Sequence, residues 1–362
     1  PPAPPPRGGP PPRGAPPGAP APPGAGTREE LANLAEQAAR LCKADLVTEM
    51  VGEFPELQGL MGGYYAAKEG LPVEVSDAIR DHYKPVGQGD DVPTAPVTVA
   101  VSLADKLDNL IEFFAVDERP TGSKDPYALR RAALGTIQTI FANGLRLNLA
   151  KVALAQTVGR AFDISEQTLG RQIVDFFADR LKVQQREAGV RHDIVDAVTE
   201  LVEEDDLVRL LARVHALQAF IETENGTNLL AGYKRAANIL KKENHTVTPA
   251  KAGVSSDGAQ VPEMPAFAGM TDFEISYSPE TAERALIDAL AEAAPTAEQA
   301  VRTERFADAM AALATLRGPI DAFFDEVTVN DDDSAKREAR LNLLARFTAA
   351  VGNVADFSRI EG

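Results

Sequence analysis

The segment PTGSKDPYALRRAALG, residues 120–135, decides how the rest of the chain is interpreted. Its first half is rich in proline and glycine, which interrupt helices and strands alike, so a loop is expected there. Apolar side chains then recur at i, i+3, i+4 and i+7, which predicts a helix over about residues 127–144. Asp125 or Ser123 can cap this helix, and Pro126 suits its first turn.

Three cations lie in this loop and on the first turns of the predicted helix: Lys124, Arg130 and Arg131. Positive charge at a helix start opposes the helix dipole, so local helix stability does not explain these residues. An anion outside the helix explains them better. The alternative that stays open is a solvated helix start with carboxylate neighbours.

Two more segments extend the pattern: LVTEMVGEFPELQGLMGGYYA (46–66) and VTVAVSLADKLDNLIEFF (97–114). Together with GSKDPYALRRAALG (122–135) they closely resemble the C-terminal part of the bacterial glycyl-tRNA synthetase beta subunit. The resemblance covers about residues 31–244 and resumes over about 272–362, where the chain ends in FSRIEG. In that family a large N-terminal portion precedes the matching region, so the sequence is expected to be a fragment.

Helical spacing of apolar residues, with almost no strand-like alternation, predicts an all-α fold. Residues 1–26 hold 13 of the 26 prolines and six glycines, and are expected to be a disordered tail. The resemblance implies a degenerate HD-like helical domain over 27–118 and a DALR-type anticodon-binding helical domain over 119–244 plus 272–362. Residues 245–271 break the helical pattern and are expected to be an inserted flexible loop.

Composition limits the classes of function. A net charge of −17 argues against a protein that coats nucleic acid, DNA included, through a basic surface. One cysteine, Cys42, excludes an intramolecular disulfide and suits a reducing cytoplasm. No apolar run approaches the roughly 20 residues of a membrane span, and no signal-peptide pattern is present. A cytoplasmic protein without membrane contact is expected.

A metal-dependent phosphohydrolase is the alternative that an HD-like domain raises. The resemblance matches Asp105 to the distal aspartate of such enzymes, but residues 53–56 read Glu-Phe-Pro-Glu where a His-Asp pair is expected. His82 is followed by Tyr83 rather than by aspartate. A catalytic metal needs several convergent ligands, so no metal site is expected. Asp105 is expected to pair with Lys106 or another neighbour.

Three segments carry the resemblance to the DALR-type domain: DPYALRRAAL (125–134), LLAGYKRAANILKKEN (229–244) and FFDEVTVNDDDSAKREARLNLLARF (323–347). Cations in or beside them are the candidates for contact with tRNA phosphates: Lys124, Arg130, Arg131, Lys234, Arg235 and Arg340. Unpaired bases stack on exposed aromatic rings. Tyr233 and Phe324 are the candidates for that role, with core packing favoured for Phe324.

The resemblance implies a beta subunit of glycine–tRNA ligase, a heterotetramer of two alpha and two beta subunits that attaches glycine to its tRNA with ATP. ATP, Mg²⁺ and the adenylation site then belong to the alpha subunit, and this chain has no catalytic residue and binds no cofactor. The sequence contains no P-loop and no evident nucleophile–base pair. The expected partners are the alpha subunit and glycine tRNA. The alternative is a stand-alone RNA-binding or scaffold module.

Overall fold

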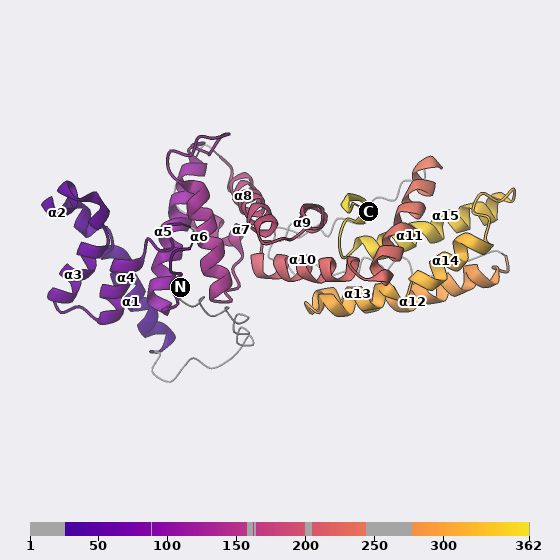
Figure 1. Cartoon of the computed structure of the whole chain (residues 1–362), viewed down its shortest axis with the longest axis horizontal. Helices are drawn as coiled ribbons and strands as arrows, with labels where there is room; N and C mark the ends of the chain where they lie inside the picture. The colour runs from indigo at the N-terminus through magenta and orange to yellow at the C-terminus, as the bar shows by residue number, and fades with distance from the viewer. Residues whose placement is uncertain are drawn as a thin grey trace, which may run out of the picture. The chain divides into compact units, whose positions relative to one another are not determined.

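The computed structural model describes residues 26–87, 89–157, 162, 164–199, 205–243 and 277–361. The regular structure of these residues is helical, as predicted, and they contain no strand (Figure 1). No described helix is both long and apolar enough to cross a membrane. The predicted tail, Gly26 apart, and the predicted inserted loop lie outside the described residues.

The chain divides into two compact units between Leu181 and Lys182, inside α8 (Glu166–Glu187), and each unit is described by itself. In unit 1 the central helix is α5 (Pro96–Ala115), which packs against α1, α4, α6 and α7. Its apolar face buries residues such as Leu107, Leu110 and Ile111. The other helices of unit 1 that precede α8 are α1 (Arg28–Leu41), α2 (Glu49–Glu53), α3 (Leu60–Lys68), α4 (Val73–Asp81), α6 (Leu129–Ala142) and α7 (Leu149–Thr157).

The sequence predicts that Thr27 caps the first helix, and α1 begins there. Thr27 and Glu30 form a reciprocal capping box at the start of α1. The apolar pattern predicts one helix from there to about residue 52, but α1 ends at Leu41. The Asp45 carboxylate turns inward and accepts the N–H groups of Gly59 and Gly62, at 2.6 and 3.0 Å. This long-range contact leads the chain out of the helix.

The segment 120–135 forms two successive turns before α6. Thr121 and Lys124 exchange backbone hydrogen bonds across a two-residue turn. Asp125 then caps α6, as predicted, by accepting the N–H groups of Leu129 and Arg130 at 2.8 and 3.0 Å. The prediction for Pro126 is wrong: it lies in a turn before the helix, where proline fixes the backbone of the second position. Ala128, in the left-handed region, separates that turn from α6.

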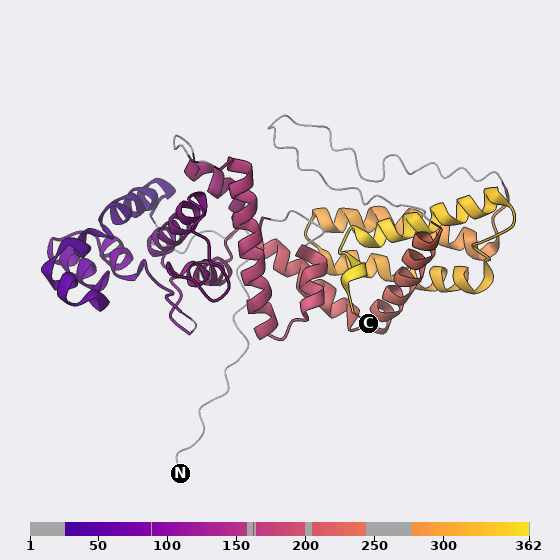
Figure 2. The ribbon, with the colours of Figure 1, turned by 90° about the horizontal axis from the view of Figure 1, so that it is seen from above.

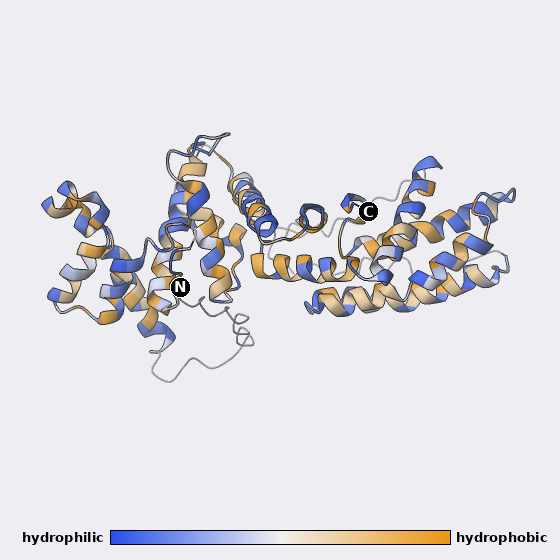
Figure 3. Ribbon diagram, viewed as in Figure 1, coloured by the Kyte–Doolittle hydropathy of each residue, from blue (hydrophilic) through white to orange (hydrophobic). Residues whose placement is uncertain are grey.

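Unit 2 is a helical bundle. Its helices after α8 are α9 (His192–Thr199), α10 (Leu207–Ile221), α11 (Glu224–Lys242), α12 (Thr281–Arg302), α13 (Phe306–Ala314), α14 (Arg317–Glu326) and α15 (Ser334–Gly352). Helix α12 packs against α13, α14 and α15, and α11 packs against α10, α14 and α15. The yellow α15 lies beside the orange α12 in Figure 2. Orange hydrophobic residues alternate with blue hydrophilic ones along α10, as in an amphipathic helix (Figure 3).

Pro295 does not divide the helices of unit 2. The sequence pattern predicts separate helices over 279–293 and 295–313, whereas α12 continues through Pro295 to Arg302. Burial of the alanines around the proline outweighs the one hydrogen bond that proline removes. The break comes at Glu304, whose positive φ ends the helix, and the next N–H, of Arg305, bonds back to Ala300.

The boundary predicted between residues 118 and 119 falls between α5 and α6, two helices that pack against each other. The division by contacts comes later, within α8. The predicted boundaries separate segments that resemble different families, and they stay a prediction.

Candidate RNA-binding surfaces

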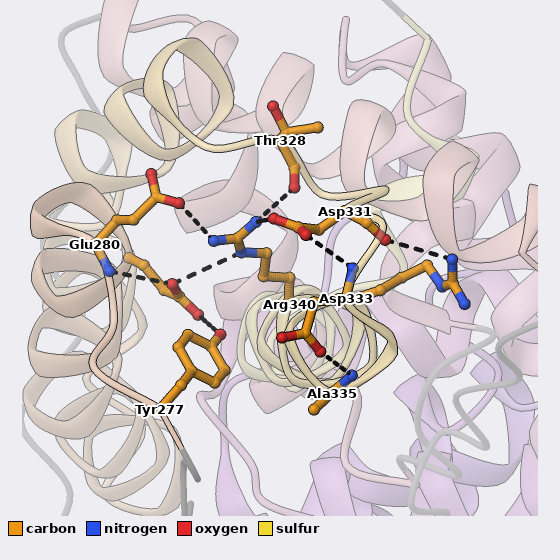
Figure 4. Close-up of polar contacts among 9 residues, drawn as sticks. Tyr277, Glu280, Thr328, Asp331, Asp333, Ala335 and Arg340 are labelled. Atoms are coloured by element: carbon orange, nitrogen blue, oxygen red, sulfur yellow. Dashed lines mark hydrogen bonds and ion pairs between the residues drawn. The ribbon is translucent and has the colours of Figure 1, made fainter.

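Arg340 is buried, although the sequence predicts an RNA contact for it. Its side chain on α15 is 1% exposed. Nη2 donates to Glu280 Oε1 at 2.6 Å, and Nη1 donates to Asp331 Oδ2 and to the Thr328 carbonyl, both at 2.8 Å (Figure 4). Nε lies 3.7 Å from Glu283 Oε2. The structure therefore contradicts a direct contact between Arg340 and tRNA, because its guanidinium is surrounded by protein groups.

Glu283, one of the acids in this network, is also held by hydrogen bonds. Glu283 on α12 is fully buried, accepts the Tyr277 hydroxyl and also accepts the Glu280 N–H at 3.3 Å. Burial on its own lowers the pKa of Arg340, but the carboxylates of Glu283 and Glu280 outweigh it and the pKa is raised. Arg340 is charged at any physiological pH and serves as a structural anchor between α12, α15 and the loop before α15.

A first cationic surface lies in unit 1 at the start of α6. Lys124 and Arg131 are exposed, and their side chains have no hydrogen bond or ion pair with another described residue. Arg130 is half-buried and its Nη2 donates to the Gly122 carbonyl at 2.7 Å, so it supports the loop. Two of the three predicted cations are thus available to an anion, while Arg130 has a structural role as well.

Tyr127 belongs to this first surface, although the sequence analysis did not select it. The residue is 46% exposed, and its ring stacks on Phe113 of α5, with centroids 4.0 Å apart and an interplanar angle of 19°. An exposed ring that lies between Lys124 and Arg131 in the sequence offers a stacking platform for an unpaired base. An aromatic residue flanked by cations in the sequence is a signal that could have found it.

A second cationic surface lies in unit 2 on α11. Arg235 is exposed and its guanidinium lies 4.3 Å from the centroid of the half-buried Phe324 ring. Arg235 Nη2 also donates to the Phe324 carbonyl at 3.3 Å, which holds the stack in place. The neighbouring Lys234 is half-buried. The structure therefore gives Arg235 a flat, exposed guanidinium face, which is well suited to base or phosphate contact.

The predicted aromatic residues of unit 2 are not free platforms. Tyr233 packs against Phe357 with centroids 5.6 Å apart, and burial raises its pKa to about 12. Phe324 touches Phe323 and is covered by Arg235. Since the two cationic surfaces belong to different compact units, the structure describes two candidate surfaces and does not place them in one site.

Asp105 and His82, which were considered above as metal ligands, both contact the Lys43 ammonium group. Lys43 Nζ lies 2.7 Å from Asp105 Oδ1 and 3.0 Å from His82 Nε2. His82 Nδ1 bonds to the Ile79 carbonyl at 2.7 Å, so Nδ1 carries the proton and Nε2 accepts from Lys43. Burial and the Lys43 charge lower the pKa of His82 and keep it neutral. Asp105 therefore pairs with Lys43 and not with Lys106.

Lys106 is itself buried beside this cluster. Its Nζ donates to the carbonyls of residues 82, 83 and 84 and to Ser102 Oγ, at 2.9–3.3 Å. Burial lowers its pKa to about 8. Among the described residues, no three His, Cys, Asp or Glu side chains come together in a way that could hold a metal ion.

Comparison with known proteins shows which family the chain resembles. Residues 25–200 match the family model for the glycyl-tRNA synthetase beta subunit. The chain is 51% identical over 331 residues to the glycine–tRNA ligase beta subunit of Rhodospirillum centenum, and 50% identical over 331 residues to that of Paracoccus denitrificans. The chain belongs to the glycyl-tRNA synthetase beta subunit family. In the same chain, residues 229–356 match the family model for the DALR anticodon binding domain.

The alignments cover 90% and 91% of this chain but 43% and 44% of the two relatives. The chain thus spans less than half the length of the curated relatives it matches. Lys124, Tyr127 and Arg131 lie in the segment that matches the beta-subunit model. Lys234 and Arg235 lie in the segment that matches the anticodon-binding model.

Proposed function

We propose that this chain is the tRNA-holding part of a glycine–tRNA ligase. It binds glycine tRNA and positions it for aminoacylation, which is a contribution to rate through orientation. An alpha subunit supplies ATP, Mg²⁺ and the adenylation chemistry, and this chain supplies no catalytic residue and no cofactor site. The assembly is a cytoplasmic heterotetramer of two alpha and two beta subunits.

The observation that supports this proposal most directly is the stack of Arg235 on Phe324 within the segment that matches an anticodon-binding model. It combines a positive charge, a flat face and exposure, which are the properties that bind unpaired nucleotides. Lys124, Tyr127 and Arg131 provide a similar combination in unit 1. In a chain of net charge −17, such local groups favour binding of one defined RNA over general coating.

Filter retention of labelled tRNA over a salt series tests the proposal. Glycine tRNA is expected to bind more tightly than a non-cognate tRNA, with an affinity that falls as salt rises. The variant Lys124→Ala/Arg131→Ala is expected to reduce the slope of log affinity against log salt by about two, one for each phosphate contact. The control Arg28→Ala/Lys68→Ala removes two exposed cations outside both surfaces and leaves the slope unchanged. Equal binding of both tRNAs, or an unchanged slope in the first variant, would contradict the proposal.

A stand-alone RNA-binding or scaffold module is the second candidate function, since the cationic surfaces alone do not require a partner subunit. Capture of a purified alpha subunit by this chain distinguishes the two. Retention of the alpha subunit supports the ligase role. Tight tRNA binding without retention of the alpha subunit favours the stand-alone module.

A further inference from the structure

A pocket of about 200 Å³ lies in unit 2, between the end of α11 and the loop that precedes α15. Its apolar lining comes from Ile239, Val329 and Leu341. Lys242 and Arg337 bring two positive charges to the same lining. A small apolar cavity with cations at its edge fits a flat, uncharged ring that is attached to an anionic group, and an RNA nucleotide has this chemistry.

Two polar residues of the lining can read the edge of such a ring. The Asn330 amide can both donate and accept a hydrogen bond. The Glu243 carboxylate only accepts, and carboxylates in nucleic-acid sites accept from exocyclic amino groups. Glu243 also repels a bare phosphate, so the pocket is a poorer site for a free anion than for a base that donates hydrogen bonds.

The pocket and the second cationic surface share one face of α11. Arg235, Ile239 and Lys242 follow one another at i, i+4 and i+7, so they share one face of α11. Lys242 is exposed and has no hydrogen bond or ion pair with another described residue. One strand of RNA that stacks on Arg235 can therefore follow this face of α11 with its next phosphates on cations.

The buried Arg340 holds the loop that forms the other wall. Its two bonds from Nη1, to the Thr328 carbonyl and to Asp331 Oδ2, fix the loop on both sides of Val329 and Asn330. Its bond to Glu280 ties the same loop to the start of α12 (Figure 4). The wall is thus fixed before any ligand arrives, and a fixed wall lowers the entropic cost of binding.

We propose that this pocket receives one unpaired RNA base that bears an exocyclic amino group. Glu243 and Asn330 read the base edge, while Lys242 and Arg337 bind the adjoining phosphates. Arg340 is a positioning residue: it contacts no RNA and acts by holding the loop with Asn330. This proposal rests on the tRNA-binding function proposed above and adds the chemical class of nucleotide and the residues that select it.

Fluorescence anisotropy with short labelled homo-oligoribonucleotides tests the selectivity. The full chain is expected to bind oligo(A) or oligo(C), whose bases carry amino groups, about tenfold more tightly than oligo(U), which has none. Glu243→Met and Asn330→Leu are expected to bring the ratio of the affinity for oligo(A) or oligo(C) to the affinity for oligo(U) close to one. Lys242→Met is expected to weaken all three oligomers alike and to leave the ratio unchanged, because phosphate contacts carry no base information.

Arg340→Lys tests the positioning role separately. It keeps a positive charge but cannot fork between Thr328, Asp331 and Glu280, so the ratio is expected to fall while salt dependence is retained. Circular dichroism shows whether this variant folds; if it does not, the ratios of Glu243→Met and Asn330→Leu decide. If the native chain binds glycine tRNA but the affinity ratios are unchanged in those two variants, the proposal for the pocket is refuted and the proposed function stands. If the native chain binds no tRNA, both the pocket proposal and the proposed function are refuted.

Discussion

Removal of the Arg340 guanidinium is the perturbation with the largest expected effect on unit 2. Arg340→Met retains most of the side-chain volume and removes the charge and the bonds to Glu280, Asp331 and Thr328. Glu283, which is fully buried, then loses the only cation that the structure places against it among the described residues. The variant therefore leaves a buried acid without charge compensation.

The magnitude follows from this burial. Breaking a buried ion pair by removing one partner costs about 3–5 kcal/mol, because the remaining charge stays desolvated. For a unit of this size each kcal/mol corresponds to about 2–4 °C, so the midpoint of unfolding is expected to fall by about 6–20 °C. The matched control is Arg337→Met, since Arg337 is half-buried and makes one bond of 3.4 Å to the Asp331 carbonyl. It is expected to cost about 1 kcal/mol or less.

Scanning calorimetry at several pH values is the assay. The hydrogen bond from the Asp333 N–H, followed by that from Arg340, lowers the pKa of Asp331, so its contribution is present above its unfolded pKa and is lost as pH falls through the folded pKa. The difference between native chain and variant is therefore expected to be greatest at neutral pH and to shrink below about pH 4. A variant that melts within 2 °C of the native chain at pH 7, or a difference that grows in acid, would refute the reasoning.

Three further predictions concern unit 1. Lys43→Met removes the charge that, after burial, lowers the pKa of His82, and an NMR titration is expected to show that pKa shifted upward; an unchanged or lower pKa would argue against the contact. Lys106 is charged in the unfolded chain up to about pH 10.5 but in the fold only to about pH 8, so the unfolded state binds more protons in between. Urea titrations are expected to show stability rising from about pH 8 to 10.5, and Lys106→Met is expected to flatten this rise; the same slope in both chains would exclude a lowered pKa. Thr27→Ala breaks the capping box of α1 and is expected to cost about 1 kcal/mol in the same titrations, whereas a neutral change would mean that the start of α1 frays in the native chain.

Helical periodicity was sufficient to predict the all-α fold and most helix positions, because each helix buries an apolar stripe that is visible in the local sequence. The cap at Asp125 was also local and was predicted correctly. The end of α1 and the continuation of α12 through Pro295 depend on contacts with residues that are distant in the sequence. Asp45 bonds to glycines 14 and 17 residues away, and the alanines around Pro295 are buried by other helices.

The candidate site was harder to predict than the fold. Charge and motif position selected Arg235 and Arg340 alike, but exposure depends on what packs over each side chain. Arg235 rests on Phe324 at the surface, whereas Arg340 is enclosed by α12 and by the loop before α15. These neighbours lie up to 89 residues away in sequence, so no local pattern distinguishes the two arginines. Tyr127, by contrast, stood beside the selected cations and was overlooked.

Hydroxyl-radical footprinting of glycine tRNA on the full chain is the most direct test of the central claim, that this chain holds glycine tRNA and does so through Arg235 in the segment that matches the anticodon-binding model. The account predicts protection of the anticodon loop by the native chain and loss of that protection in Arg235→Ala, with protection retained in the control Arg28→Ala. Protection confined to other parts of the tRNA, or an anticodon footprint that Arg235→Ala leaves intact, would contradict it.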